Sequence, residues 1–263
     1  MPTKVTIPPE SGQPRVTVIG SGTGVPSLKR GYPATLVRAE GEIMLLDTGP
    51  CTLARLLHHG ITYADIDKVF YTHLHPDHSA DMTSMLFAMR NADPRRTKQL
   101  DVFGPPGLKE FYEGLNRVYG SVLTPQSYEL RLTEVSGGEV AFAGWKIKTS
   151  SMSHMVPTTG YRLEFSNGSV LVYSGDTDYC ENIVNLANGA DVLILECSFP
   201  DDLRVEGHLV PSLCARIARE SGCRTLVLSH LYPQWEGRDI LRECRKFYEG
   251  EIIIAEDSME LPL

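Results

Sequence analysis

The sequence lacks a long apolar run, an excess of basic residues and any closely spaced pair of cysteines. Its apolar segments, such as residues 191–195, are far shorter than the roughly 20 residues of a membrane-spanning helix. The formal net charge of −8 argues against broad non-specific binding of nucleic acid, although a local basic groove would be compatible with it. The six cysteines contain no CxxC pair, and a chain of 263 residues is too long for a disulfide scaffold. We therefore expect a cytoplasmic protein with reduced, mostly buried thiols and no membrane contact.

The N-terminal residues 1–14 are predicted to form a flexible leader. They carry Pro, Ser and Gly and lack the apolar core of a signal peptide. The remaining residues, 15–263, show no repeat, low-complexity stretch or long linker and predict a single domain.

Both halves of the chain contain apolar strand patterns followed by helix patterns. This order predicts two sheets packed together with helices outside. A stripe of methionines in the second helix has helical spacing and is expected in the core. The pattern predicts strands at 15–20, 34–37, 43–46, 68–71, 145–150, 161–165, 170–173, 191–196, 225–228 and 252–255, the last closing the chain, and helices at 53–59, 80–91, 211–220 and 240–248.

Three of the eight histidines lie within residues 73–78, directly after the apolar run 69–71. Imidazole and carboxylate groups are the ligand types that suit zinc, iron or manganese. Several polar rings at the end of a core strand are costly unless something binds them. The segment therefore indicates a metal site.

Polar residues also follow other apolar strands, and loops at strand ends are where a sheet holds functional groups rigidly. If these strands point the same way, their ends converge on one rim. His73 and His75 can chelate one cation, and Asp77 and His78 can face a second. Two cations about 3.5–4 Å apart share a hydroxide and lower its pKa towards 7, which suits hydrolysis of esters and amides. The other strand-end residues are Asp47, His154, Asp176, Glu196 and His230.

Residues 73–78 resemble the HxHxDH signature of the metallo-β-lactamase superfamily, and Asp47, His154, Asp176 and His230 follow in the family order. Three more features resemble its ribonuclease Z-like branch. They are the glycine-rich start at 20–26, the GPPGL segment at 104–108, and Glu196 followed by the pair Gly207-His208. The resemblance extends from about residue 15 to the C-terminus. It implies an α/β fold, an αβ/βα four-layer sandwich of two mixed β-sheets flanked by helices, with the site along one edge.

The resemblance also implies two divalent metal ions, with zinc favoured over manganese or iron. In the family, the residue at Asp77 orients or deprotonates the attacking water, and the residue at Asp47 holds ligand loops in place. A purely structural role is the alternative for Glu196, as a strand-end cap, and for His208, at a helix start. Carried over by position, the resemblance implies that one ion is held by His73, His75 and His154 and the second by Asp77, His78 and His230, with Asp176 bridging them. It also implies that Glu196 and His208 form a pair at the scissile phosphate, where His208 stabilises charge or protonates the leaving group.

One feature departs from the family. Ribonuclease Z that matures tRNA has a long flexible arm between the positions of His154 and Asp176, whereas only 21 residues separate them here. The missing arm and the acidic charge argue against tRNA 3′ processing. We therefore expect a metal-bound hydroxide to cleave a small-molecule phosphodiester, and RNA is not favoured.

Several alternatives stay open from the sequence. The same site suits an arylsulfatase, a lactonase or another ester hydrolase. A di-iron redox protein is a different class, but the family's oxygen reductases have Glu at the position of His75. A binding module without catalysis is a third class, although every ligand position is filled. Members of this branch are often dimers, which leaves a homodimer open.

Overall fold

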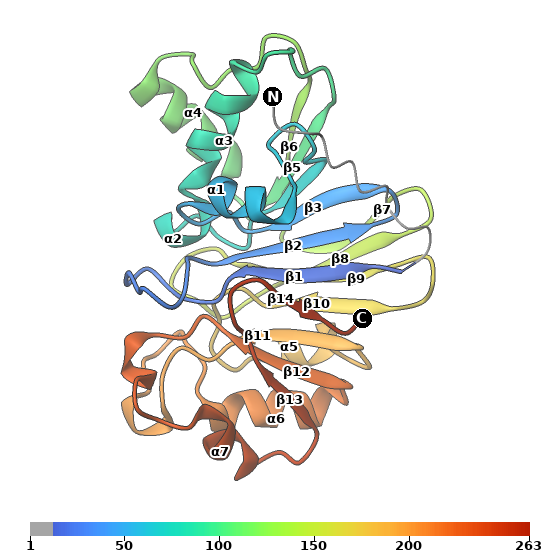
Figure 1. Cartoon of the computed structure of the whole chain (residues 1–263). Helices are drawn as coiled ribbons and strands as arrows, with labels where there is room; N and C mark the ends of the chain where they lie inside the picture. Colours follow the sequence, from blue (N-terminus) through green and yellow to red (C-terminus); the bar gives the residue numbers. More distant parts are fainter. Residues whose placement is uncertain (1–12) are drawn as a thin grey trace.

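A computed structural model describes residues 13–263 and shows two seven-stranded mixed sheets packed face to face, with helices on both outer sides (Figure 1). This arrangement confirms the predicted αβ/βα sandwich. The predicted leader, residues 1–14, lies outside the described residues except for Gln13 and Pro14. Among the described residues, no helix is both long and apolar enough to cross a membrane.

The first sheet has the strand order β14-β1-β2-β3-β4-β5-β6. Its strands β3 to β6 run parallel to one another, and the other pairs are antiparallel. The strands are β1 Arg15–Gly20, β2 Ala34–Ala39, β3 Glu42–Leu46, β4 Lys68–Phe70, β5 Leu100–Gly104, β6 Leu130–Glu134 and β14 Met259–Leu261, and this half carries the helices α1 Thr52–Leu56, α2 Pro76–Ser79, α3 Asp81–Arg90 and α4 Leu108–Tyr119.

The second sheet has the strand order β13-β12-β11-β10-β9-β8-β7. Here β10 to β13 run parallel, and β7 to β10 form an antiparallel meander. The strands are β7 Gly137–Ala141, β8 Lys146–Ser151, β9 Thr159–Glu164, β10 Val170–Tyr173, β11 Val192–Glu196, β12 Thr225–Ser229 and β13 Glu251–Ile254, and this half carries α5 Glu181–Leu186, α6 Pro211–Ser221 and α7 Ile240–Arg245.

The core has three layers, one between the sheets and one beneath each set of helices. Successive residues of a strand point to opposite faces, so Val69 packs against the helices and Phe70 packs between the sheets. Phe70 stacks on Phe103 with ring centroids 5.1 Å apart. The parallel strands are apolar on both faces because both faces are covered. The methionine stripe of α3 is fully buried, which confirms that it is core.

The parallel strands position the site. Their carboxyl ends lie at one edge of each sheet, and loops at that edge of an α/β sheet are the usual place for a binding site. The loops after β3 and β4 in the first sheet therefore meet the loops after β10, β11 and β12 in the second.

The structure corrects several element predictions. The strand at 252–255 does not close the chain, because β14 follows it and pairs with β1. The helix expected at 53–59 is a short α-helix followed by a 3-10 turn at Leu57–His59. The helix expected at 240–248 ends at Arg245. The strands β5, β6 and β7 and the helices α4 and α5 were not predicted. The cysteines are free, and four of them are buried, as expected.

Arg96 stabilises an irregular segment of the first half. Its side chain is buried, and its guanidinium donates hydrogen bonds to the carbonyl oxygens of Tyr63, Ala64, Ile66 and Gln99 at 2.6–3.3 Å. Three of these carbonyls belong to the loop that leads into β4, so this arginine helps to fix the strand that carries the histidine segment.

We expect Arg96→Met to lower the free energy of unfolding by about 3 kcal/mol, because it leaves several buried carbonyl groups without donors. Urea denaturation followed by circular dichroism measures the change. Arg95→Met alters the exposed neighbouring residue and is the control, with an expected change within about 0.5 kcal/mol. Equal midpoints for the two variants would contradict this role of Arg96.

Candidate metal centre

The candidate metal centre lies where the loops of the two sheets meet. The loop after β4 carries His73, and the helix α2 that follows carries Asp77 and His78. From the second sheet, Asp176 follows β10 and His230 follows β12. All of these strands are parallel within their sheets, so their ends deliver the ligand-type side chains to one place.

The first group of ligand-type atoms comes from His73, His75, His154 and Asp176, which all lie within 4.8 Å of one another. The Nε2 atom of His73 is 3.0 Å from Nδ1 of His75 and 3.8 Å from Oδ2 of Asp176. Two ligand atoms on one tetrahedral zinc ion, each about 2.1 Å from it, are separated by roughly 3.4 Å. The spacing of these side chains therefore fits a shared cation.

The second group comes from Asp77, His78 and His230. The Nε2 atom of His230 is 3.5 Å from Oδ2 of Asp77 and 3.3 Å from Nε2 of His78. Asp176 contacts this group with its other oxygen, since Oδ1 lies 3.4 Å from His78 and 3.5 Å from His230. One carboxylate thus presents one oxygen to each group, and the structure brings together all seven residues for which a ligand role was predicted.

Two atoms of the centre indicate what it holds. The Nε2 atom of His154 and the Oδ1 atom of Asp176 are buried and have no hydrogen-bond partner. A buried polar atom without a partner costs about 1–3 kcal/mol, so such atoms are rare unless a ligand contacts them. Imidazole nitrogens and carboxylate oxygens are the donors of zinc-type sites. The residues present therefore fit divalent cations.

The protonation states of His73 and Asp176 suit cation binding, whereas burial lowers the pKa of His78 but the carboxylates of Asp176 and Asp47 outweigh burial and raise it well above its usual value. Burial lowers the pKa of His73 well below its usual value, which keeps the ring neutral. Burial raises the pKa of Asp176, but the neighbouring His230 and His78 outweigh burial and hold this pKa well below the usual range. A neutral imidazole and an ionised carboxylate are the forms that bind metals.

The outward-facing ring nitrogens of the histidines are fixed by protein acceptors. Nδ1 of His78 donates to Oδ2 of Asp47 at 2.8 Å, and Nδ1 of His154 donates to the carbonyl oxygen of Gly207 at 2.9 Å. Nδ1 of His230 donates to Oγ of Ser198 at 3.0 Å. Each of these bonds fixes a tautomer, so the lone pair of the other nitrogen faces the centre.

Asp47 is fully buried and holds the histidine segment, the role that the family resemblance implied for it. It accepts hydrogen bonds from His78, from the backbone amide of Thr72 at 2.8 Å and from the hydroxyl of Tyr173 at 3.0 Å. It therefore links the histidine segment of the first sheet to β10 of the second sheet.

We expect Asp47→Ala to weaken metal binding about 10- to 100-fold, because it removes the acceptor that orients His78. Competition with a chromophoric chelator measures the affinity. Asp191→Ala, at the opposite end of β11, removes a carboxylate far along the strand from the centre and is the control. Unchanged affinity in Asp47→Ala would show that this residue does not orient a ligand.

Glu196 and His208 form a hydrogen-bonded pair beside the two groups. Nδ1 of His208 donates to Oε1 of Glu196 at 3.0 Å and lies 4.0 Å from Oδ2 of Asp176. The amide of Thr177 also donates to Oε1 of Glu196 at 2.7 Å. Burial lowers the pKa of His208, but the hydrogen bond and the charge of Glu196 outweigh burial and raise the pKa to about 9. The ring therefore carries a proton at neutral pH.

Ser198 belongs to this network but was not predicted. Its hydroxyl donates to Oε2 of Glu196 and accepts from Nδ1 of His230. It thereby connects the Glu196–His208 pair with a ligand of the second group. Its position two residues after Glu196, beyond the end of β11, is the sequence signal that could have indicated it.

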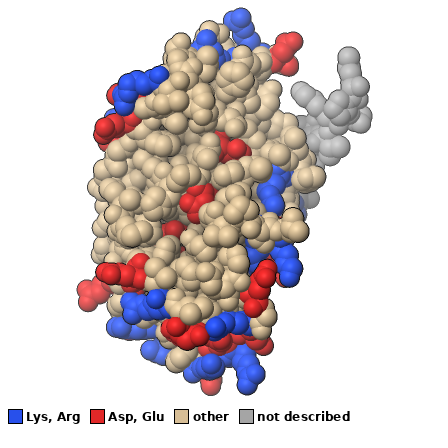
Figure 2. Space-filling view, turned by 90° about the vertical axis from the view of Figure 1, so that its left-hand side faces the viewer, with Lys and Arg blue, Asp and Glu red and all other residues tan. Residues whose placement is uncertain are grey.

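The glycine-rich turn lies on the rim of the centre. A Cβ atom on Gly24 would lie 3.3 Å from Oδ2 of Asp77. Figure 2 shows the face that carries α2, and uncharged side chains cover most of its middle. Acidic side chains lie near the middle, and the basic side chains gather mainly towards its upper and lower ends and its right-hand side. This face has no continuous basic track.

Sequence comparisons agree with this geometry. A family model described as the Beta-lactamase superfamily domain matches residues 43–231. The ribonuclease Z of Methanothermobacter thermautotrophicus is 26% identical over 296 aligned positions, which cover 93% of this chain and 95% of that protein. The ribonuclease Z of Mycobacterium bovis is 31% identical over 245 positions, which cover 83% and 86% of the two chains.

Solved structures share the fold. The metallo-beta-lactamase fold protein YhfI from Bacillus subtilis superposes with a TM-score of 0.80 and 23% identity, covering 94% of this chain and 98% of that chain. The short form of human tRNase Z superposes with a TM-score of 0.76 and 23% identity over the same shares. A diphosphatase of the PhnP family gives a TM-score of 0.72 and 20% identity, with 95% and 98% covered.

Proposed function

The chain belongs to the beta-lactamase superfamily, and on this premise we propose that it is a metal-dependent hydrolase that cleaves a small phosphodiester at a two-metal centre. The position of Asp176 is the observation that carries the proposal. One of its oxygens faces each group of ligand-type atoms, and the Glu196–His208 pair lies beside both groups. That arrangement suits a bridging carboxylate next to a proton donor.

The proposed ligands follow the two groups. Zinc is the favoured metal because the family resemblance implies it, and the imidazole and carboxylate donors are compatible with it as they are with manganese or iron. Two such cations, when bound, polarise a phosphoryl group and make water a nucleophile near neutral pH. In the proposal, His73, His75 and His154 hold one cation, Asp77, His78 and His230 hold the other, and Asp176 is shared.

Asp77 is proposed to orient the attacking water. Burial raises the pKa of its carboxyl group, but the hydrogen bond to His230 and the charges of His78 and His230 outweigh burial and lower this pKa. A carboxylate with a lowered pKa is a weak base. It therefore accepts a hydrogen bond from the water and aligns it more than it removes a proton.

His208 is proposed to give a proton to the leaving group. Its raised pKa keeps the ring protonated at neutral pH, and Glu196 fixes Nδ1, which leaves Nε2 to face the substrate. After His208 has given up its proton, the negative charge of Glu196 favours protonation of the ring again.

Several observations support a small substrate. The 21 residues between His154 and Asp176 are used by the loop that leads into β9, by β9 and β10 and by the turn between them, so no arm extends from this part of the described chain. The alignment with the archaeal ribonuclease Z spans 296 positions, more than the 263 residues of this chain, so that relative has segments that this chain lacks. RNA is the second candidate substrate, and the names of the relatives favour it.

Three substrates separate the candidates when they are offered to the zinc- or manganese-loaded protein. We expect turnover of bis-p-nitrophenyl phosphate, much slower turnover of p-nitrophenyl sulfate, and no cleavage of a tRNA precursor with a 3′ extension. Cleavage of the precursor alone would favour RNA processing. Absence of phosphodiester turnover with either metal would contradict the proposal.

A further inference from the structure

A cavity of about 660 Å³ opens beside His154, at the edge of the sheets that carries the candidate metal centre. We call it the side pocket. The loops after β8 and β10, the loop before α6 and α6 itself form its walls. Its lining includes Met155, Tyr179, Arg204, Leu213 and Arg216. The residues proposed for catalysis, Asp77, Glu196 and His208, do not line it.

Tyr179 and Arg216 form a stacked pair in the side pocket. The guanidinium of Arg216 lies 3.9 Å from the centroid of the Tyr179 ring. Glu220 fixes both groups, since it accepts from the hydroxyl of Tyr179 at 2.7 Å and from Nε of Arg216 at 2.9 Å. Both side chains are solvent-accessible, so an outer face of this stacked pair is available to stack on a planar ligand.

Asp178 ties the walls of the side pocket together. Its carboxylate accepts two hydrogen bonds from Arg204 at 2.9 and 3.0 Å, and its amide donates to the carbonyl oxygen of Ser153 at 2.7 Å. Its neighbour Thr177 is bonded to Glu196. The shape of the pocket is therefore set before a ligand arrives, which reduces the entropy lost on binding.

The charges in the side pocket select against a polyanion. Both arginines are already paired, Arg204 with Asp178 and Arg216 with Glu220, and Glu206 adds a further negative charge. A strand of RNA carries a phosphate on every nucleotide and would need unpaired cations here. Exposed Met155 and half-buried Leu213 instead offer apolar contact.

We propose that the side pocket binds a planar aromatic group attached to the phosphoryl group, either the aryl group of a simple ester or the base of a mononucleotide. The inference rests on the proposed function, because the metal centre must hold the phosphoryl group. The stacked pair of Tyr179 and Arg216 presents an outer face to the ring, and Met155 contacts the edge of the ring.

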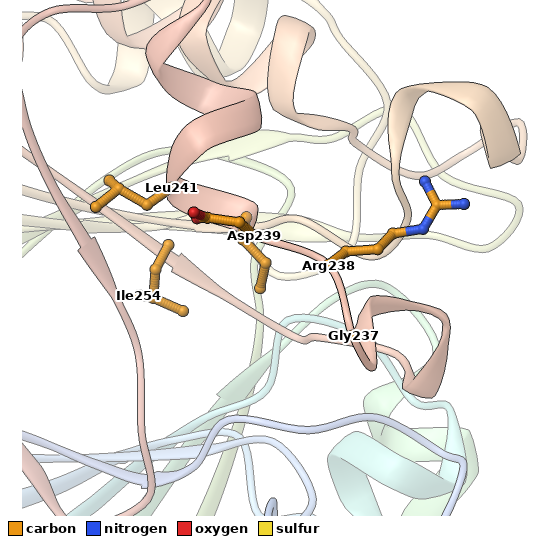
Figure 3. A pocket seen from close by; sticks show the side chains of 6 residues that line it. Gly237, Arg238, Asp239, Leu241 and Ile254 are labelled. Carbon is orange, nitrogen blue, oxygen red and sulfur yellow. The ribbon is translucent and has the colours of Figure 1, made fainter.

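The hollow between α7 and β13 offers no comparable site. Figure 3 shows its lining residues, with Leu241 and Ile254 facing each other and Arg238 turned away. Arg238 is paired with Asp202, and Asp239 accepts a hydrogen bond from the amide of Arg242 at the start of α7. Both charged groups are thus already used within the fold.

Two pairs of small ligands test the inference by isothermal titration calorimetry on the zinc-loaded full chain. Phenylphosphonate and methylphosphonate differ only in the ring, and adenosine 5′-phosphate and ribose 5-phosphate differ only in the base. We expect the ring-bearing member of at least one pair to bind roughly tenfold more tightly, and Tyr179→Ala and Arg216→Ala each to remove most of that preference. Arg219→Ala, on the same helix, is the control and keeps it.

The pair that loses its preference in the variants identifies the ring as aryl or nucleobase. Equal affinities within both pairs in the unaltered protein, or preferences that survive both variants, would overturn the inference. A variant that weakens methylphosphonate as much as phenylphosphonate disturbs the phosphoryl site and also counts against it. Failure of the proposed function looks different, because then neither phosphonate binds to the zinc-loaded protein.

Discussion

His208→Ala is expected to slow cleavage of a poor leaving group at least 100-fold and to slow cleavage of a good leaving group less than tenfold. A proton donor contributes about 10²- to 10⁴-fold when the departing oxygen needs a proton. Phenolate, with a pKa of about 10 for its acid, needs one far more than the much less basic p-nitrophenolate. Methyl phenyl phosphate and methyl p-nitrophenyl phosphate therefore separate the two roles considered for this residue.

The measurement is kcat for both substrates, together with the metal content of each protein. Glu196→Gln is expected to show the same selective loss to a smaller degree, because it removes the charge that keeps His208 protonated. Equal losses for the two substrates would assign His208 to charge stabilisation instead of proton transfer. A loss of metal in His208→Ala would assign it to the ligands, since its ring also lies near Asp176 and His230.

Asp176→Ala is expected to remove at least one of two bound metal ions and to reduce phosphodiester turnover on the order of 1,000-fold or more. The side chain is buried, belongs to the first group of ligand-type atoms and contacts the second group with its other oxygen, so its loss removes a donor near both groups. The control is again Asp191→Ala, which removes a carboxylate from the other end of the same sheet. Retention of two metals in Asp176→Ala would show that this carboxylate is not shared.

The sequence could predict the candidate centre because the ligand-type residues are encoded locally. His73, Asp176 and His230 each lie within three residues after the end of a parallel strand, and parallel strands bring such ends to one edge of their sheet. Taken alone, Asp176 in its Ser-Gly-Asp-Thr segment would be interpreted as a turn residue. It is interpreted as a metal ligand because His73 and His230 also follow strands.

What the sequence could not predict depends on distant partners. The strand β14 has three residues and exists because it pairs with β1, more than 240 residues earlier. The strand β7 begins with two glycines and is largely exposed, so it lacks the apolar alternation that marks a strand. An arginine such as Arg96 is expected at the surface from the sequence, and only the fold places four carbonyl oxygens around it.

The proposed substrate differs from the one that the names of the relatives indicate. The relatives are named ribonuclease Z, while this chain has a mainly uncharged face over its centre and a neutral-to-acidic side pocket. Retention of the hydrolytic residues with a different surface for substrate binding is a common way for one fold to serve several substrates.

One carboxylate is proposed to join two metal sites, and the metal content of the protein tests this arrangement most directly. Inductively coupled plasma mass spectrometry on protein loaded with zinc and freed of excess metal should give two ions per chain. Asp176→Ala should give one or none, and Asp191→Ala should still give two. A single ion per chain in the unaltered protein, or no stable metal at all, would contradict the two-metal centre.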